Sequence, residues 1–462
     1  MYPIISLSIT GLLTLFLGFA DNKKLVFPVS ILFLLLALGL SFVDWNAPGY
    51  YFNGMLAVNN ESIAFWAIVI VTAILVLSLS EGFDRIEFSQ PAEYLAIAQF
   101  SLVGAIMMIS YNNLIMLFLG IEILSVAMYV LTGADKRNLR GNEAAIKYFL
   151  MGAFATGILL FGIAMFYGAT GSFNLDSVSG LMQEGSADAL FLWIGCTFML
   201  IGMLFKVSAA PFHLWTPDVY EGAPTIFTAF MSTIVKTAGF VALFKILSSA
   251  FNGLGEVWAI MFAVVVLLSL VIGNLGALSQ SSFKRLMAFS SISHAGFMLL
   301  ALLGDHNNAL STILFYSLAY TLATISAFGV LLVVSKERTE NGRAYEKIDL
   351  FRGLIKENGF LTAVLTISML SLSGIPLTAG FWGKFFVFSN ASGSDFFWLI
   401  IVAVLMSAVA IYYYFKPIKE AFDRSGELST IKINSIFKII FGITTLGTIV
   451  LGIFPDLIRS IF

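Results

Sequence analysis

Cysteine is almost absent from this sequence. Cys196 is the single one, which excludes a disulfide within the chain. The sequence also lacks a Cys-x-x-Cys pair and a Cys/His cluster, the ligand patterns of iron–sulfur and structural zinc sites. Neither a G-x-G-x-x-G turn nor a P-loop occurs. Nucleotide and metal-cluster chemistry would therefore have to take place in another polypeptide.

Charge is scarce as well. Of 462 residues, 11% are charged and 59% are hydrophobic, and the formal net charge is -2. So small a net charge gives no indication of a nucleic acid or an acidic substrate as partner, and the composition is not that of a soluble domain. No basic residue precedes the first apolar run, so this run is expected to be a retained first helix rather than a cleaved signal.

Long apolar runs fill most of the chain. A helix needs about 20 apolar residues to cross a bilayer, and continuous runs favour helices over the alternating strands of a membrane barrel. We therefore predict an all-α polytopic membrane protein of about 14 transmembrane helices. The predicted spans are 3–20, 24–43, 62–80, 92–110, 112–132, 143–168, 187–217, 224–248, 255–278, 284–303, 307–335, 359–390, 396–416 and 434–458.

The predicted topology places most of the 25 lysines and arginines, Arg85 and Arg424 among them, in or beside the odd-numbered connections. Short cytoplasmic loops collect such residues. Both termini are therefore expected on the outer, periplasmic side of a bacterial inner membrane.

A weak internal repeat suggests a duplication. YFLMGAFAT, from Tyr148, and YSLAYTLAT, from Tyr316, share four positions at one offset. Two units of five helices each, helices 4–8 and 9–13, would enter the membrane from opposite sides and form inverted repeats. The expected organisation is one membrane domain over residues 1–462: three N-terminal helices in 1–91, the repeats in 92–250 and 251–417, and a loop and last helix in 418–462.

Four ionisable residues fall inside predicted helices, and loop rules do not explain them. Glu122 lies halfway along helix 5, and Lys206, Lys236 and Lys384 lie in helices 7, 8 and 12. A charge at membrane depth costs about 2.5 to 3.5 kcal/mol even on a lenient scale. Pairing that only locks helices together is one explanation. One carboxylate does not neutralise three lysines, however, so a proton path explains the set better.

Lysine suits a proton path because an ammonium group removed from water can exchange its proton near neutral pH, whereas arginine keeps its proton. The two predicted helix breaks support the same interpretation. Pro211 follows Lys206, and Pro376 precedes Lys384. A broken helix at membrane depth is tolerated where it lines a polar cavity or is buried in protein. A single such proline is commonly a structural kink, so the indication comes from the repetition. Lys384 lies late in a helix that runs outward, which makes it the expected proton exit.

Three further residues are weaker candidates. His213 and His294 could relay protons, since histidine titrates near neutrality, or could be buried histidines satisfied by hydrogen bonds. Lys147 could mark the cytoplasmic edge of helix 6 or take part in the relay.

Several of these segments together resemble a known family. FKVSAAPFHLWTPDVYEGAPT followed by Lys236, the pair Glu122 and Lys206, and SGIPLTAGFWGKF are similar to the antiporter-like N subunits of proton-pumping NADH:quinone oxidoreductase, respiratory complex I. The VYEGAP version of the loop differs from related L and M subunits and Mrp-type antiporters, which often have LPDA there. Lys384 stands where M-type subunits tend to have glutamate. The resemblance covers essentially the whole chain.

The resemblance implies roles for the candidate residues. Glu122 would tune Lys206, Lys236 would pass the proton along a central polar axis, and Lys384 would connect to the outside, with Lys147 and His213 on the same hydrated axis. NADH, FMN, iron–sulfur clusters and quinone would belong to partner subunits, and no cofactor or metal is expected in this chain. The implied partners are other membrane and peripheral subunits, including a neighbouring M subunit and small membrane subunits, together with the lipid bilayer.

Two other functions remain open from the sequence. A secondary cation/proton antiporter of the Mrp type would need a site for an exchangeable cation. A scaffold would use the buried lysines only to hold helices together, so replacing Lys206 would weaken assembly instead of stopping proton movement.

Overall fold

The computed structural model describes residues 1–20, 23–80, 90–175, 189–250, 256–340, 343–344, 346–423 and 430–459. Within these residues, ten helices are long and apolar enough to cross a membrane, and four shorter apolar helices accompany them. The ten and the four together match the fourteen predicted segments, and the all-α membrane fold is confirmed. Arg85 and Arg424, which entered the orientation prediction, lie outside the described residues.

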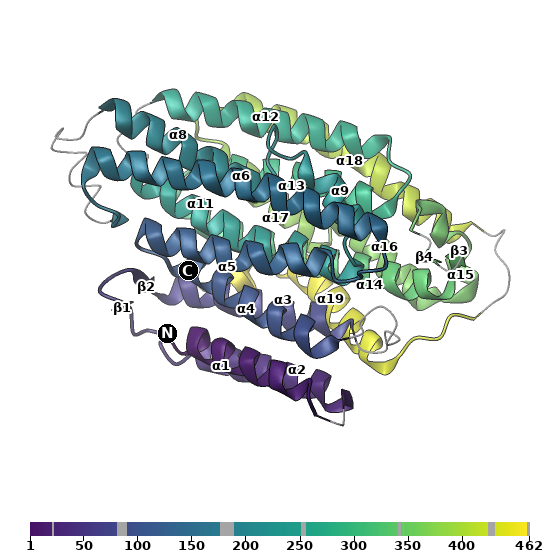
Figure 1. Ribbon diagram of the computed structural model, residues 1–462. Helices are drawn as coiled ribbons and strands as arrows, with labels where there is room; N and C mark the ends of the chain where they lie inside the picture. Colours follow the sequence, from purple (N-terminus) through teal and green to yellow (C-terminus); the bar gives the residue numbers. More distant parts are fainter. Residues whose placement is uncertain are drawn as a thin grey trace. The chain divides into compact units, whose positions relative to one another are not determined.

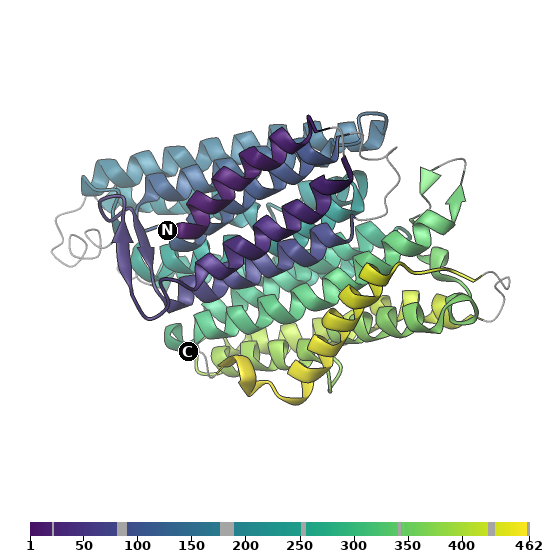
Figure 2. The same ribbon diagram turned by 90° about the horizontal axis from the view of Figure 1, so that it is seen from below.

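The first ten helices and the first hairpin cover residues up to 250. They are α1 (Tyr2–Leu17), α2 (Val26–Ser41), α3 (Asn60–Ser78), α4 (Pro91–Ser110), α5 (Leu114–Thr132), α6 (Leu139–Thr170), α8 (Ala189–Lys206), α9 (Trp215–Gly222), α10 (Thr225–Phe230) and α11 (Lys236–Ala250). The short turns η1 (Lys23–Leu25) and η2 (Met231–Val235) precede α2 and α11. Strands β1 (Gly49–Tyr51) and β2 (Leu56–Val58) form an antiparallel hairpin (Figure 2).

The later elements follow the same helical pattern. They are α12 (Glu256–Leu278), α13 (Phe283–Leu302), α14 (His306–Glu337), α15 (Leu354–Glu357), α16 (Gly359–Ser373), α17 (Ala379–Ala391), α18 (Phe397–Phe422), α19 (Ser435–Ile453) and α20 (Asp456–Arg459). The two-residue strands β3 (Thr339–Glu340) and β4 (Arg343–Ala344) pair with each other, and η3 (Ile348–Phe351) precedes α15.

Local sequence explains where these helices begin and end. The side chains of Asn113, Ser282, Asp305 and Asn358 accept hydrogen bonds from backbone N–H groups in the first turns of α5, α13, α14 and α16. Such caps satisfy donors that an isolated helix start leaves free. At the other end of α16, Gly374 adopts a left-handed conformation with φ of 86°, which ends the helix.

Both predicted helix breaks are present. α8 ends at Lys206 and α9 begins at Trp215, with a cis peptide bond between Ala210 and Pro211 in the connection. α16 ends at Ser373 and α17 begins at Ala379. Each break therefore leaves helix ends at the centre of what would otherwise be one long span.

The described chain forms two compact units. Unit 1 takes its residues from Met1–Leu77, Phe83–Ser208 and Gly222–Phe262. Unit 2 takes its residues from Ser78–Gly82, Ala209–Glu221 and Ala263–Phe462. In unit 1, α5 packs between α4 and α6, and α1 packs on α2 and α4 (Figure 1). The subdivision of the chain into 1–91, 92–250, 251–417 and 418–462 stays a prediction.

In unit 1, even-numbered connections contact one another. The backbone N–H of Asn112 donates to Met55 O at 2.9 Å, and that of Leu114 donates to Phe173 O at 2.9 Å. The N-terminal ammonium group pairs with Asp44 at 3.2 Å. Met55 and Asp44 follow the second predicted span, Asn112 follows the fourth and Phe173 follows the sixth. These even-numbered connections and the N-terminus therefore share one end of this unit, as the predicted topology requires.

In unit 2, odd-numbered connections contact one another. Lys284 pairs with Glu346 at 2.6 Å, and Arg285 pairs with Asp218 at 2.8 Å and with Glu221 at 3.0 Å. Asp218 and Glu221 follow the seventh predicted span, Lys284 and Arg285 lie at the connection after the ninth, and Glu346 follows the eleventh. The odd-numbered connections of unit 2 thus lie at one end of that unit.

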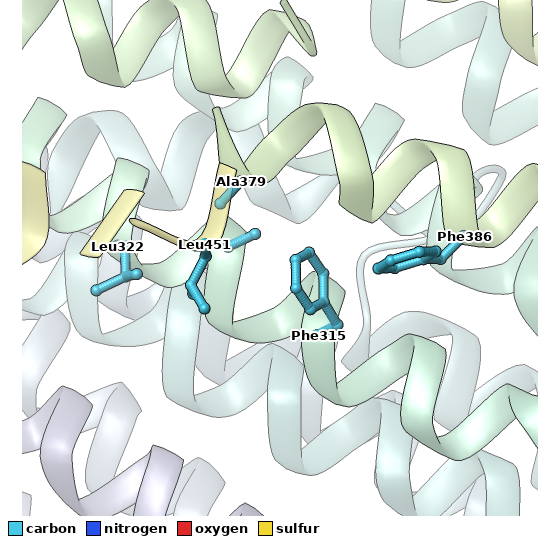
Figure 3. Close-up of a cluster of buried hydrophobic side chains, with 6 residues drawn as sticks. Phe315, Leu322, Ala379, Phe386 and Leu451 are labelled. Atoms are coloured by element: carbon cyan, nitrogen blue, oxygen red, sulfur yellow. The ribbon is translucent and has the colours of Figure 1, made fainter. Parts of the chain in front are cut away.

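A cluster of buried apolar side chains holds α14, α17 and α19 together in unit 2 (Figure 3). It consists of Phe315, Ala319, Leu322, Ala379, Phe386 and Leu451. Beside it, the indole N–H of Trp382 donates to Gly452 O at 2.8 Å. The second half of the broken span, α17, is therefore anchored to two other helices.

Candidate functional site: buried lysines in each unit

The first group of candidate residues lies in unit 1, between α5 and α8. Lys206, the last residue of α8, is 5% exposed, and its Nζ donates to Ser125 Oγ at 2.7 Å. Ser125 lies one turn after Glu122 on α5, so both side chains leave the same side of that helix. Glu122 is partly buried and close enough for its charge to act on Lys206. The ammonium group thus has a hydroxyl as hydrogen-bond acceptor and a carboxylate nearby.

Lys236 belongs to the same unit and is 3% exposed. It follows the π-helical turn Met231–Val235, a kind of distortion that is frequent at functional sites. One turn further, a Cβ at Gly239 would lie 2.9 Å from Val207 Cγ1 and 3.9 Å from Lys206 Cγ. The glycine therefore lets α11 approach the stem of Lys206, and unit 1 holds Glu122, Lys206 and Lys236 together.

The second group surrounds Lys384 in unit 2. Lys384 lies on α17 and is 5% exposed. Its Nζ donates to Ser373 O at 2.7 Å and to Ser407 Oγ at 2.9 Å, and it lies 4.9 Å from the ring centroid of Phe297. Ser373 O is a carbonyl at the C-terminus of α16, where the helix dipole favours a cation. The aromatic face adds a cation–π contact.

His294 is held on both sides by tyrosines in unit 2. Its Nδ1 lies 2.6 Å from Tyr316 Oη and its Nε2 lies 3.0 Å from Tyr414 Oη. The Tyr414 hydroxyl also bonds to Ser290 Oγ. His294 therefore has its hydrogen bonds satisfied and belongs to a chain of hydroxyl groups. Its part in a proton relay stays a prediction.

A small cavity opens beside this histidine. Its lining includes His294, Tyr316, Tyr320, Ser371, Gly380 and Gly383. Gly383 directly precedes Lys384 in α17. His294 and the glycine before Lys384 therefore line one small cavity in unit 2.

The first break contains buried polar groups. The N–H of Ala210 donates to Ser269 Oγ at 2.9 Å, and His213 is 8% exposed. His213 Nδ1 is buried without a hydrogen-bond partner among the described residues. Pro211 is exposed, as is Pro376 in the second break. Both prolines lie in the connections after their helices, and neither is buried.

Lys147 lies at the surface of the described chain. Its side chain is 43% exposed and pairs with Glu143, one turn earlier on α6, at 2.8 Å. The position agrees with the edge of a membrane span.

Among the described residues, no group of three or more His, Cys, Asp and Glu side chains could hold a metal ion. That no cofactor binds to this chain remains an expectation from the sequence.

Some residues of these sites were not predicted from the sequence. Ser125 could have been found, because a serine one turn from Glu122 stands on the same helix face. Ser407, Gly239 and the carbonyl of Ser373 carry no local signal, since they reach the lysines only through packing.

Comparison with known proteins places these sites in a family. The family described as NADH:quinone oxidoreductase/Mrp antiporter, TM matches residues 111–410. An NADH-quinone oxidoreductase subunit N from Flavobacterium psychrophilum is 38% identical over 461 residues, covering 100% of both chains. The chain belongs to the NADH-quinone oxidoreductase subunit N family. The resemblance seen in the sequence is thereby confirmed.

Solved structures agree with this assignment to subunit N. A chain of respiratory complex I from Thermus thermophilus with bound aureothin superposes with a TM-score of 0.86 at 32% identity, covering 99% of this chain and 98% of that one. A chain of the Mrp complex from Dietzia superposes with a TM-score of 0.85 at 17% identity, over 100% and 96% of the two chains. The second likeness shows a shared fold alone. The chain is therefore an antiporter-like, multi-pass membrane subunit.

Proposed function

We propose that this chain moves protons across a bacterial inner membrane as a subunit of a redox-driven NADH:quinone oxidoreductase. Glu122, Lys206 and Lys236 carry the proton in unit 1, and Lys384 releases it from unit 2. Oxidation of NADH and reduction of quinone belong to other subunits of the complex. An M-type neighbour and small membrane subunits are its partners within the membrane. No redox step is assigned to this chain.

The observation that carries the proposal is that two buried lysines donate their hydrogen bonds to neutral acceptors. Lys206 donates to a serine hydroxyl, and Lys384 donates to a carbonyl and a serine hydroxyl. A buried ammonium group is costly unless it is well compensated. Because its hydrogen bonds go to neutral acceptors, each lysine can release its proton without breaking a hydrogen-bonded ion pair.

Burial of polar atoms around the first break supports a hydrated surrounding. Ser208 Oγ, His213 Nδ1 and Thr216 Oγ1 are buried without hydrogen-bond partners among the described residues. Water ordinarily satisfies such atoms. We therefore assign His213 to the hydrated path and Lys147 to its cytoplasmic edge.

The orientation follows from the basic residues. Lys284, Arg285 and their partners occupy the odd-numbered end of unit 2, and lysine and arginine favour the cytoplasmic side. Both termini are then periplasmic.

The test is Lys206→Met in the assembled complex, studied in inverted membrane vesicles with NADH as donor. Proton uptake per NADH oxidised should fall by about tenfold or more, while NADH oxidation with an artificial electron acceptor reports normal assembly. Normal assembly with normal pumping would refute the proposal. Loss of assembly would support the scaffold, and pumping that depends on sodium would support the cation/proton antiporter.

A further inference from the structure

The segment Ala209–Glu221 belongs to unit 2, although the residues before and after it in the chain belong to unit 1. The chain leaves unit 1 directly after Ser208 and returns to it at Gly222. Lys206, the last residue of α8, stands two residues before Ser208. The first break is therefore a covalent link between a buried lysine of unit 1 and a segment that packs in unit 2.

The backbone is strained where the chain leaves unit 1. Ser208 has a φ of 62°, in the left-handed region that glycine favours. Its hydroxyl group is buried, and it has no hydrogen-bond partner within the part of the chain that the structure describes. A residue other than glycine keeps such a conformation where the surrounding structure enforces it. Attachments on both sides of Ser208 are therefore needed to hold the break in this shape.

Arg285 of α13 attaches the far end of the segment. Its Nη1 donates to Asp218 Oδ1 at 2.8 Å and to Glu221 Oε2 at 3.0 Å. The two carboxylates stand one turn apart on α9, so one guanidinium group reaches both. The three side chains are 30%, 38% and 31% exposed. Partly buried pairs of this kind are less screened by salt than surface pairs, and charge-assisted hydrogen bonds are stronger than neutral ones.

Two neutral contacts join the same segment to unit 2. The N–H of Ala210 donates to Ser269 Oγ at 2.9 Å. The hydroxyl of the buried Tyr220 interacts with Ser291, which lies further along α13. Arg285 adds an ionic attachment to these neutral ones, close to the point where the chain returns to unit 1.

The helix that carries Arg285 also contacts the second buried lysine. Arg285 lies in the first turn of α13, and Phe297 lies about three turns later on the same helix. The ring centroid of Phe297 is 4.9 Å from Lys384 Nζ. One continuous helix therefore connects the attachment of the first break to the surroundings of Lys384.

We propose that Arg285 is a positioning residue for Lys206. By holding both carboxylates of α9, it fixes the segment Ala209–Glu221 to α13. The end of α8 then follows displacements of the helix that contacts Lys384, because the chain between them is short and attached. The inference rests on the proposed function, since the position of Lys206 matters only if this lysine takes part in proton movement.

The experiment removes the charge of Arg285 and measures two quantities in the assembled complex. In Arg285→Gln, amide hydrogen exchange of residues 209–221 should become at least about tenfold faster, because a segment with fewer attachments opens more often. Proton uptake per NADH oxidised, measured in inverted vesicles, should fall by at least about threefold, because Lys206 is no longer held in place. NADH oxidation with an artificial acceptor should stay unchanged. Unchanged exchange of residues 209–221 would refute the attachment.

Arg352 provides the matched control in unit 2. Its Nε also faces two carboxylates, Glu420 at 3.0 Å and Asp423 at 3.6 Å, and both lie outside the segment 209–221. Arg352→Gln should leave the exchange of this segment and proton uptake unchanged. Equal effects of the two arginine variants would overturn the inference, because the loss of any arginine pair would then loosen the segment.

A rescue variant and a combined variant separate positioning from a general structural role. Arg285→Lys keeps the positive charge and should recover at least about half of the proton uptake lost in Arg285→Gln. Asp218→Asn/Glu221→Gln removes the same ion pairs from the other side, and combining it with Arg285→Gln should cause no further loss. Additive losses would overturn the inference. Should Arg285→Gln fail to assemble, Arg285→Lys and the double variant decide the question.

A last comparison distinguishes this inference from the function on which it rests. If Lys206→Met stops pumping while Arg285→Gln pumps as the unmodified protein does, the positioning role is refuted and the proposed function stands. If Lys206→Met itself pumps normally, the proposed function fails.

Discussion

Lys206 and Lys384 are equally buried, yet their surroundings differ. Lys206 has one serine hydroxyl as acceptor and the charge of Glu122 nearby, whereas Lys384 has a helix-end carbonyl, a serine hydroxyl and an aromatic face. The attraction between Lys206 and Glu122 depends on the carboxylate charge, whereas the contacts of Lys384 are with neutral groups. On the proposed function, Lys206 would respond to a nearby charge, whereas Lys384 would be held in a fixed, neutral setting.

The nearby carboxylate is what distinguishes Lys206 from Lys384, so moving it from one lysine to the other should cause the largest loss of proton pumping. Glu122→Gln removes the carboxylate near Lys206, and Ser407→Asp places one against Lys384. A carboxylate stabilises the charged form of a neighbouring lysine, so Lys206 would bind its proton too weakly and Lys384 would release it too slowly. We expect proton uptake per NADH oxidised to fall by about tenfold or more in each variant, measured in inverted vesicles.

Conservative replacements serve as controls for that exchange. Glu122→Asp keeps the carboxylate and Ser407→Thr keeps the hydroxyl, so both should retain most of the pumping. If Ser407→Asp pumped as well as Ser407→Thr, the constant neutral setting of Lys384 would be unimportant.

Replacing the glycine beside each lysine with alanine should have the next largest effect, a loss of stability. At Gly374, a Cβ would lie 2.9 Å from Lys384 Cδ, and the backbone has φ of 86°. Gly374→Ala should therefore lower the free energy of unfolding by about 1 to 2 kcal/mol from the left-handed backbone alone. At Gly239, in regular helix, the Cβ would lie 2.9 Å from Val207 Cγ1 and 3.9 Å from Lys206 Cγ. Gly239→Ala should be the milder of the two in thermal unfolding of the extracted complex.

Gly442 provides the control for these two variants. It lies within α19, and a Cβ there would meet nothing within 4 Å. Gly442→Ala should leave stability unchanged or raise it by about 1 kcal/mol or less through helix propensity. Equal destabilisation by all three alanines would show that close approach to the lysines is not the cause.

Removing the serine acceptors should have a smaller effect. Ser125→Ala removes the hydrogen bond from Lys206 to Ser125. In Ser407→Ala, by contrast, Lys384 keeps its hydrogen bond to Ser373 O. A hydrogen bond to a charged group contributes about 1.5 to 3 kcal/mol. Ser125→Ala should therefore reduce the pumping rate more than Ser407→Ala does, by initial-rate measurement in vesicles. The reverse order would contradict the assigned contacts.

Replacing Lys147 should have the smallest effect on stability and on proton pumping. Its exposed pair with Glu143 resembles surface ion pairs, which contribute about 0 to 1 kcal/mol. Lys147→Ala should leave both thermal stability and proton uptake close to those of the unmodified complex. A strong loss of pumping would instead place Lys147 on the relay, beside the lysines of unit 1.

Much of the fold could be predicted because membrane helices have a strong local signal. Apolar length located the spans, and Pro211 and Pro376 located both breaks within a few residues. The buried lysines were also visible, since a charge inside an apolar run is conspicuous in a sequence. Glu122 and Ser125 stand on one helix face, a relation that helical spacing alone contains.

The rest depends on contacts between distant segments. Ser407 and Lys384 are 23 positions apart, and Ser125 and Lys206 are 81 apart. No periodicity within one helix indicates which neighbour it will meet. The direction in which Pro211 faces was likewise beyond the sequence, because it depends on how the chain turns after α8 ends.

The anchoring of α17 limits how Lys384 can act. Trp382 is tied to Gly452, and Ala379 and Phe386 are embedded in the apolar cluster with α14 and α19. A rigid-body movement of α17 would break those contacts. On the proposed function, the ammonium group would instead be displaced by rotamer changes of the Lys384 side chain, while the backbone of α17 stays in place.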